Sequence, residues 1–288
     1  MKITYTSPNL SHHYPYAIAM NNQGVLNFFV TGVSRFNTNG KNINLTNKLK
    51  RYDFFQNIFL LSRYLKLNNT IQSKLANISQ NFLDKASFKY AKDSDFFIYY
   101  RGCGSSTTKK LRTHNKNVIS ILEEVNTHVL FQNKILLEEC KRIGIESSLE
   151  TKRFDRHLRA YELADYILCP SNFVANSFLS MGFPNKKLIV NNFGRTFKTQ
   201  PFIHEKNEEE FKLLYVGQLH YRKGIRYAIE AFKKIKYKKK KFYLVGPITG
   251  PTGIDLNSLP KDIFYLGVLK GSQLREIYNS VSAFVLPS

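Results

Sequence analysis

The residues with the clearest chemical potential lie in a short turn in the last third of the sequence. There an apolar run, 211–216, leads into the segment Gly217-Gln-Leu-His-Tyr-Arg-Lys-Gly224, and a helical pattern follows. This spacing places Lys223, Arg222 and free backbone N–H groups at a helix amino terminus, where phosphate groups bind. The segment has neither the GxxxxGK[ST] spacing of a Walker loop nor the GxGxxG dinucleotide fingerprint. A purely structural Lys-Gly helix start would give the same pattern.

A histidine follows another apolar run, in the middle of the chain. Residues 118–122 predict a strand, and Val125-Asn-Thr-His128 comes shortly after it. Because α/β folds bind ligands beyond the carboxyl ends of their strands, His128 is placed where a substrate would be contacted. Most single histidines are surface residues or satisfied core residues, and this structural role stays open.

The elements that position the turn around Lys223 alternate regularly. Strands are expected at 211–217, 242–246, 263–267 and 283–286. Apolar residues at helical spacing predict helices over 224–235 and around 274–281. Strands that are apolar throughout and separated by amphipathic helices form parallel sheets covered on both faces. The pattern predicts a doubly wound α/β domain.

The earlier part of the chain shows the same alternation less regularly. Strands are expected at 26–31, 96–100, 118–122, 166–169 and 188–190. Helices are expected at 54–65, 71–82, 130–143, 156–163 and 172–181. Residues 37–50 are rich in Asn and have no strong period, so they are expected to be a loop. The polar stretch 198–210 predicts a linker between a first domain, residues 1–197, and a second, residues 211–288.

The composition excludes several classes of protein. The chain has 288 residues, of which 43% are apolar and 14% aromatic, enough to fill two cores. Its apolar runs fall well short of the roughly 20 residues of a spanning helix, and it shows no secretory signal, so a cytoplasmic location is expected. Three separated cysteines without a CxxC pair predict reduced thiols and neither a disulfide framework nor a zinc site.

The charge is strongly positive. With 43 Lys and Arg against 21 Asp and Glu, the net charge is +22, which attracts nucleic acid, anionic lipid or phosphorylated small molecules. The densest run has seven Lys between 233 and 241 and is either a solvated helix end or a membrane-surface or polyanion patch. A second cluster, Lys109 to Lys116, is either a basic rim or a flexible loop. The sequence has no nucleic-acid readout motif, so no specific nucleic-acid partner is expected.

Several motifs occur in one order between residues 118 and 288. They are Tyr161–Val174, Gly182–Val190, Asn192-Phe-Gly194, Lys223-Gly224 and Val285-Leu-Pro-Ser288. In this order they resemble glycosyltransferase family 4, which comprises retaining enzymes of the GT-B architecture. The resemblance implies an α/β fold with two Rossmann-like domains of GT-B type, the second of them incomplete in this sequence.

The resemblance also implies a role for each residue of the turn. Lys223, helped by Arg222, would neutralise the diphosphate of a nucleotide-sugar as the glycosidic bond breaks. Gly217 and Gln218 would line the same nucleotide-sugar site. Many relatives have Arg where this chain has Gln218, so the chain departs from the family at one phosphate-binding position.

Three further sites follow from the resemblance. Gly267 and Val268 would form the turn that packs against the nucleotide base, with an ordinary strand-end glycine as the alternative. His128 would be the catalytic-site residue that contacts the donor sugar. Asp93-Ser-Asp95 looks like the metal-binding Asp-x-Asp of another glycosyltransferase architecture, but it precedes the expected strand 96–100 instead of following one. We therefore expect no metal ion and no other cofactor.

The expected function is transfer of a hexose from a nucleotide-diphosphate sugar to a surface polysaccharide or glycolipid, with retention, at the inner face of a membrane. The expected partners are the nucleotide-sugar, a glycan or lipid-linked acceptor and an anionic membrane surface. The alternative is a non-catalytic fragment that binds a nucleotide-sugar or polyanion. Relatives continue beyond the Pro-Ser with carboxylates that hold the donor sugar, whereas this sequence stops at Ser288. The chain as given is therefore expected to turn over little sugar.

Overall fold

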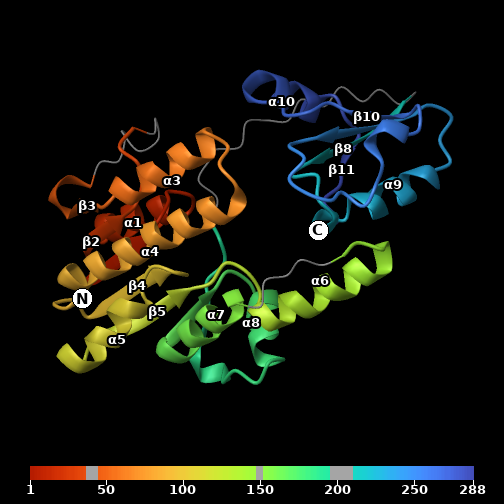
Figure 1. The fold of residues 1–288 in the computed structure, drawn as a ribbon. Helices are drawn as coiled ribbons and strands as arrows, with labels where there is room; N and C mark the ends of the chain where they lie inside the picture. The colour runs from red at the N-terminus through yellow and green to blue at the C-terminus, as the bar shows by residue number, and fades with distance from the viewer. Residues whose placement is uncertain (37–44, 147–151, 195–209) are drawn as a thin grey trace. The chain divides into compact units, whose positions relative to one another are not determined.

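A computed structural model describes residues 1–36, 45–146, 152–194 and 210–288 (Figure 1). The chain divides into two compact units. Unit 1 comprises Met1–Lys134 and Leu149–Thr196, and unit 2 comprises Ile135–Ser148 and Phe197–Ser288. Of the expected linker 198–210, all but the last residue lies outside the described residues.

Unit 1 is built on a parallel sheet of seven described strands. They are β1 (Ile3–Ser7), β2 (Leu26–Thr31), β3 (Leu49–Arg51), β4 (Phe96–Tyr100), β5 (Ile119–Glu123), β6 (Tyr166–Cys169) and β7 (Leu188–Val190). Their order is β3-β2-β1-β4-β5-β6-β7, so the direction of winding reverses between β1 and β4. This is the topology of a Rossmann-like domain.

Helices cover both faces of this sheet. They are α1 (His13–Asn22), α4 (Asn69–Ala91), α5 (Ser105–His114), α7 (Lys152–Leu163) and α8 (Asn172–Leu179). Helix α3 (Phe54–Tyr64) packs on α4, and α6 (Val129–Ile143) begins in unit 1 and ends among the residues of unit 2. Neighbouring residues of β4 enter different cores, because side chains alternate along a strand. Phe97 packs in the core that includes Leu111 of α5, and Ile98 packs in the core that includes Ala17 of α1. Burial on both faces explains why most strands of this sheet are largely apolar, whereas β1 and β3 also contain polar residues.

Unit 2 repeats this design on a smaller scale. Its described sheet has the order β10-β9-β8-β11, all parallel, with strands β8 (Phe211–Val216), β9 (Lys240–Val245), β10 (Ile263–Tyr265) and β11 (Ala283–Phe284). Tyr215 packs with Phe232 of α9 (Ile225–Lys233) on one face. Leu214 packs with Ile277 of α10 (Gly271–Asn279) on the other. The predicted two-domain α/β fold is confirmed.

One predicted helix is shorter than the helix in the structure. The apolar period indicated a helix over 71–82, but α4 continues to Ala91. Its carboxyl half buries polar side chains that find partners in the fold. Asp84 accepts hydrogen bonds of 2.9 Å from the backbone N–H groups of Ser106 and Thr107, and the Ser87 hydroxyl bonds Thr6 at 3.0 Å. Because these positions are polar, the apolar period fades while the helix stays packed.

Four elements were not predicted. Strand β1 and helix α1 lie in an amino-terminal region that showed no clear pattern. Strand β3 begins at the end of the stretch 37–50 that was expected to be a loop, of which 37–44 lie outside the described residues. The segment around Lys109 and Lys110 is helix α5, so it is not a flexible loop, and the alternative of a basic rim stays a prediction.

Two further observations concern the location of the chain. No helix in the described ranges is both long and apolar enough to cross a membrane. The three cysteines, Cys103, Cys140 and Cys169, are free and buried, which agrees with the predicted reduced thiols.

Gly246 tests the packing of unit 2. Its φ is +138°, and an added Cβ would lie 1.8 Å from the carbonyl oxygen of Gly217. We expect Gly246→Ala to destabilise unit 2 by on the order of 3 kcal/mol, because both the backbone conformation and the close contact forbid a side chain. Hydrogen exchange of the β8 and β9 amides measures this.

Gly267→Ala is the matched control for Gly246→Ala. Gly267 also has a positive φ, of +69°, but an added Cβ would meet nothing within 4 Å. We expect this variant to lose only about 1 kcal/mol, from backbone strain alone. Equal protection of β8 and β9 in the two variants would contradict the role given to the Gly246–Gly217 contact.

Candidate functional site

Unit 1 presents a candidate site where its winding direction changes. Strands β1, β4 and β5 are neighbours in the sheet and end at Ser7, Tyr100 and Glu123. In doubly wound sheets, ligands bind in the crevice beyond the carboxyl ends of the strands at this switch point. The segments that follow β1 and β5 bring charged and aromatic side chains to this edge.

Glu123 is the centre of a buried hydrogen-bond network. Its Oε2 accepts a bond from the Tyr5 hydroxyl at 2.6 Å and lies 2.9 Å from Nδ1 of His13. Its Oε1 lies 2.7 Å from Nε2 of His12. An ionised carboxylate only accepts hydrogen bonds, so both imidazoles turn an N–H toward it. The network holds His12 and His13 at the carboxyl edge.

The network also sets the charge state of this edge. Burial alone would raise the pKa of Glu123, but the hydrogen bonds from His12, His13 and Tyr5 lower it to about 2. Burial lowers the pKa of His13 despite its contact with Glu123. At neutral pH the edge therefore has an ionised Glu123 beside a neutral His13.

A second buried pair lies next to the first. Glu124 is fully buried and forms an ion pair of 3.2 Å with Arg101, which follows β4. The Tyr161 hydroxyl donates to Glu124 at 3.3 Å, and so does the backbone N–H of Asn126. Burial raises the pKa of Glu124, and the positive charge of Arg101 opposes that rise. The pair anchors the chain that leads from β5 toward His128.

His128 lies at the amino terminus of α6 and is 5% exposed. Its ring packs against Tyr161 and Phe178, with ring centroids 5.0 Å apart in both cases. Its Nδ1 accepts a hydrogen bond of 3.3 Å from the backbone N–H of Leu130. Burial lowers the pKa of His128, so the ring is neutral at neutral pH. The structure therefore gives it a helix-capping role, and its predicted contact with a sugar stays a prediction.

The switch-point edge encloses a cavity of about 490 Å³. Its lining is polar and aromatic: Asn9, Ser11, His12, His13, Tyr100, Val125 and Phe193. The His12 ring lies 4.5 Å from that of Phe193, and the His13 ring 4.9 Å from that of Tyr100. Aromatic faces and hydrogen-bonding groups at the lining suit a hydroxyl-rich ligand.

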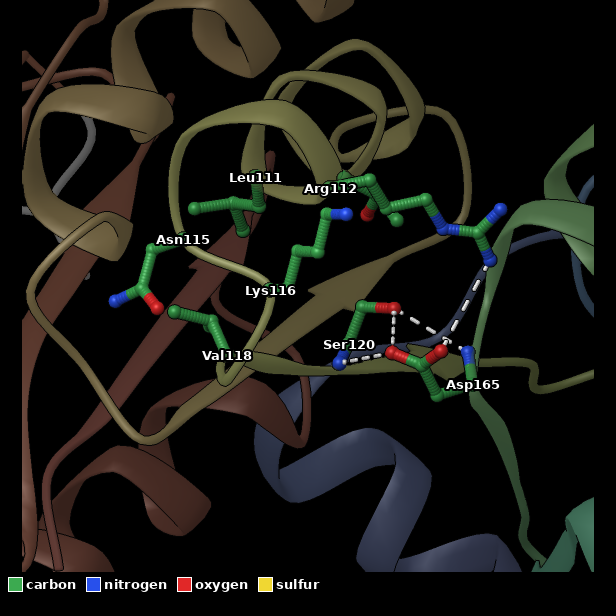
Figure 2. A pocket seen from close by; sticks show the side chains of 8 residues that line it. Leu111, Arg112, Asn115, Lys116, Val118, Ser120 and Asp165 are labelled. Atoms are coloured by element: carbon green, nitrogen blue, oxygen red, sulfur yellow. Dashed lines mark hydrogen bonds and ion pairs between the residues drawn. The ribbon is translucent and has the colours of Figure 1, made fainter.

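Another cavity in unit 1, of about 330 Å³, lies at the opposite edge of the sheet (Figure 2). It is lined by residues at the amino ends of β5 and β6 and along α5. Figure 2 shows its polar groups bonded to one another: Asp165 accepts from the Ser120 hydroxyl at 2.7 Å and lies 3.9 Å from Arg112. Because ligands of such folds bind at the carboxyl edge, this cavity is not the candidate site.

Unit 2 carries the predicted turn at the carboxyl end of β8. Gly217 donates its backbone N–H to Val245 at 2.9 Å, and the Tyr215 hydroxyl donates to the carbonyl oxygen of Gln218 at 2.8 Å. Residues Tyr221–Lys223 form a 3₁₀ turn that His220 caps through its Nδ1. Backbone bonds thus fix the course of the turn, and the side chain of Gln218 is exposed.

The turn delivers two cations to a helix amino terminus. Gly224 has φ +68° and caps α9, and an added Cβ would lie 2.3 Å from the Pro287 carbonyl oxygen. Arg222 and Lys223 directly precede this cap. Among the described residues of unit 2, the ion pairs use other bases, namely Arg142, Lys212, Arg226 and Lys241. Arg222 and Lys223 can therefore meet an anion at the positive end of the helix.

Gly267 and Val268 lie at the same edge of the second sheet. Gly267 accepts a hydrogen bond of 2.7 Å from the backbone N–H of Gly246, and Gly246 packs on Gly217. The predicted residues after β8 and β10 are thus joined through Gly246, which the sequence did not single out. Val268 is 53% exposed, so its side chain is accessible to a flat apolar ligand such as a base.

Among the described side chains, His12, His13 and Glu123 have ligand atoms close enough for one metal ion, all within 4.8 Å. These atoms already bond one another, and Tyr5 takes a further place on the carboxylate. A metal would have to break this network. Asp95 of the Asp-x-Asp pattern lies at the amino edge and accepts from the backbone N–H of Lys2 at 2.7 Å.

The two parallel sheets with their covering helices form the GT-B fold. Residues 196–288 match the family model described as "Glycosyl transferases group 1". Comparison with curated proteins gives no match.

Several solved structures share this fold over the whole chain. The lipopolysaccharide outer core galactosyltransferase WaaB has a TM-score of 0.61 at 14% identity, covering 100% of this chain and 74% of that one. Alr3699/HepE of Anabaena, in complex with UDP and glucose, has a TM-score of 0.55 at 12% identity, covering 99% and 74%. A trehalose-6-phosphate synthase has a TM-score of 0.55 at 12% identity, covering 99% and 77%. At these identities the likeness shows the fold.

The sequence did not predict the hydrogen-bond network of Tyr5, His12, His13 and Glu123, which we call the switch-point network. His12 and His13 follow a strand that was not predicted, so their position at the carboxyl edge could not be read. Glu123 and Glu124 could have been chosen as candidate site residues, because they are two acidic residues that directly follow the apolar run 118–122. Carboxylates at the end of a buried strand indicate groups that need partners in the fold.

Acid titration tests the Glu123 network. The pKa of Glu123 in the fold, about 2, lies below its ordinary value of 4.5, so the ionised form stabilises the fold above pH 4.5. This stabilisation, on the order of 3 kcal/mol, is lost as the pH falls from 4.5 toward 2. We expect Glu123→Gln to be less stable at pH 7 and to approach the wild type by pH 3, as urea unfolding would show.

Glu162→Gln is the matched control for Glu123→Gln. Glu162 is exposed in the same unit, and the substitution makes the same chemical change. Its stability should follow that of the wild type at every pH. A constant difference between Glu123→Gln and the wild type from pH 7 to pH 3 would show that Glu123 is not held ionised by the fold.

Proposed function

We propose that this chain acts as a retaining hexosyltransferase of glycosyltransferase family 4 that uses a nucleotide-sugar donor. The observation that carries the proposal is the Arg222-Lys223 turn at the amino terminus of α9. This turn lies within the residues that match the glycosyltransferase group 1 model. The order of motifs along residues 118–288 supports the family.

The donor would bind through its diphosphate at the edge of unit 2. Lys223 and Arg222 add positive charge to the free N–H groups of α9, which favours a dianionic diphosphate. As the glycosidic bond breaks, negative charge grows on the leaving nucleotide, and Lys223 stabilises it there. Gly217 and Gln218 line the approach to this position, and Gly267 and Val268 receive the base. UDP is the nucleotide in the Anabaena neighbour and the first to test.

The acceptor would bind in the switch-point cavity of unit 1. Rings such as Tyr100 and Phe193 stack on the apolar faces of sugars, while Asn9 and His12 offer partners for hydroxyl groups. This chemistry suits a glycan or the sugar head of a lipid, as in the synthesis of a surface polysaccharide. His128 would contact the donor sugar as a neutral polar group.

We further propose that transfer needs no metal ion. The Asp-x-Asp pattern lies at the amino edge of its sheet, and the switch-point histidines are engaged with Glu123. Cations on the protein would then neutralise the leaving diphosphate. Binding of UDP should therefore be the same in EDTA and in Mg²⁺, measured by titration calorimetry. An affinity that rises more than about tenfold with Mg²⁺ would overturn this part of the proposal.

We also propose a cytoplasmic location at the inner face of a membrane. Free cysteines fit a reducing compartment. The positive charge of +22 favours an anionic surface.

Lys223→Ala tests the donor site. Removing one charge-assisted contact should weaken UDP binding about thirtyfold, on the order of 2 kcal/mol, as measured by titration calorimetry. Lys236→Ala is the matched control, because Lys236 is exposed beyond the opposite end of α9. Equal affinity of the wild type and Lys223→Ala for UDP would refute the assignment. Binding of UDP-sugars without transfer of sugar would favour the non-catalytic alternative.

A further inference from the structure

Helix α3 carries a stripe of exposed apolar side chains. Phe54, Ile58 and Leu61 are followed by Leu65 at its carboxyl end, at intervals of four, three and four residues, so they share one side of the helix. They are 65%, 37%, 55% and 57% exposed. Tyr64, at 83%, flanks the stripe. A stripe at this spacing ordinarily faces a protein core, yet here it faces outward.

Helix α4, which lies beside α3 (Figure 1), carries a second stripe. Ile71, Ile78 and Phe82 are 40%, 45% and 37% exposed. Aromatic contacts join the two stripes: the Phe55 ring lies 5.2 Å from that of Phe54 and 4.9 Å from that of Phe82. We define the α3–α4 apolar face as Phe54, Ile58, Leu61, Tyr64, Leu65, Leu67, Ile71, Ile78 and Phe82.

The exposed charged side chains of α3, α4 and the connection between them are all positive. Between Phe54 and Ala91 the basic residues are Arg63, Lys66, Lys74, Lys85 and Lys89. The acidic residue of this stretch, Asp84, is 4% exposed, and its carboxylate binds the backbone of α5. A partner of this face must therefore be apolar where it meets the stripes and negative around them.

We propose that the α3–α4 apolar face inserts into the headgroup region of an anionic lipid surface. Folded proteins rarely leave a contiguous apolar patch of this kind exposed without a partner. Apolar and aromatic side chains with a Lys and Arg border, and no exposed acid, are the pattern of helices that lie in a membrane interface. The inference rests on the proposed membrane location and is independent of sugar transfer.

The lysine run 233–241 has the positive charge of this pattern but lacks its stripes of exposed apolar side chains. Lys240 donates to the backbone carbonyls of Phe232, Lys233 and Ile235, so it caps α9. Lys241 forms an ion pair of 2.9 Å with Glu210. The exposed large apolar residue of the run is Tyr237. The run adds long-range attraction to an anionic surface, whereas insertion needs the apolar side chains of α3 and α4.

The positive charge of Lys66, in the connection between α3 and α4, can be removed by a substitution that fits the backbone. Lys66 has φ +52°, a left-handed conformation that glycine adopts without strain. Its backbone N–H donates to Arg63, and that of Leu67 donates to Ser62, so the turn itself does not depend on the Lys66 side chain. Lys66→Gly should therefore remove a positive charge without loss of fold.

The sequence contains no Trp, so a single introduced Trp reports only its own surroundings. We expect the emission of Phe54→Trp to shift to the blue on addition of phosphatidylcholine vesicles that contain phosphatidylglycerol, as the side chain leaves water. Phe173→Trp is the matched control, because Phe173 is 64% exposed on α8. An unchanged Phe54→Trp spectrum, or the same shift in both variants, would overturn the proposal.

Vesicle co-sedimentation tests the same face by removal. We expect the triple variant Phe54→Ser, Leu61→Ser, Leu65→Ser to bind these vesicles at least about tenfold more weakly than the wild type. A control triple at sites of similar exposure, Phe173→Ser, Ile248→Ser and Leu286→Ser, should bind as the wild type does. Lys66→Gly combined with Lys74→Gln should weaken binding and reduce its dependence on phosphatidylglycerol.

The outcomes separate this inference from the proposed location and function. If the α3 triple keeps wild-type vesicle binding and a Lys-to-Gln variant of the run 233–241 loses it, the chain meets the membrane elsewhere and the inference is wrong. If the wild type sediments as a dimer that the α3 triple dissociates, the face is a protein interface and the inference is also wrong. UDP affinity should be unchanged in the α3 triple, and circular dichroism confirms its fold.

Discussion

The fold of unit 1 depends on the burial of one ionised carboxylate. Glu123 is 3% exposed, and its partners Tyr5 and His12 lie 118 and 111 residues earlier in the chain. A buried charge is tolerated only when hydrogen bonds replace its lost water. The burial of Glu123 is therefore coupled to the positions of β1, the turn after it and the start of α1. The same bonds hold His12 and His13 against the switch-point cavity. The hydrogen bonds of Glu123 therefore both stabilise unit 1 and position the side chains of the candidate site.

In unit 2, glycines shape the carboxyl edge of the sheet. The backbones of Gly217, Gly246 and Gly267 meet without side chains between them, and this leaves an edge of peptide groups next to Lys223. The cavity of unit 1 is lined by aromatic and polar groups, whereas the edge of unit 2 offers cations and a helix terminus. One suits a hydroxyl-rich ligand and the other a diphosphate. Two substrates of different chemistry are what a transferase must hold.

Apart from β1 and β3, the strands of both sheets could be predicted because burial on both faces makes them largely apolar. The turn at Lys223 could be predicted because its residues are contiguous in the sequence. The switch-point network could not, since Tyr5, His12 and Glu123 come together only through the pairing of β1 and β5 with β4. Helix α4 ran past its predicted end for a related reason: the partners of Asp84 lie on another helix, and no local pattern reports them.

Four acidic residues of unit 1 act inside the fold. Among the described residues, Asp53, Asp84, Glu123 and Glu124 are buried, and each is paired inside unit 1. These carboxylates stabilise the fold through their hydrogen bonds and ion pairs. The lysines stay exposed, because their long side chains keep the ammonium group in water. A chain with a net charge of +22 attracts anions over a large area, and local structure then decides which anion is held. At α9 the backbone N–H groups favour a phosphate, and at α3 and α4 the apolar stripes favour a lipid surface.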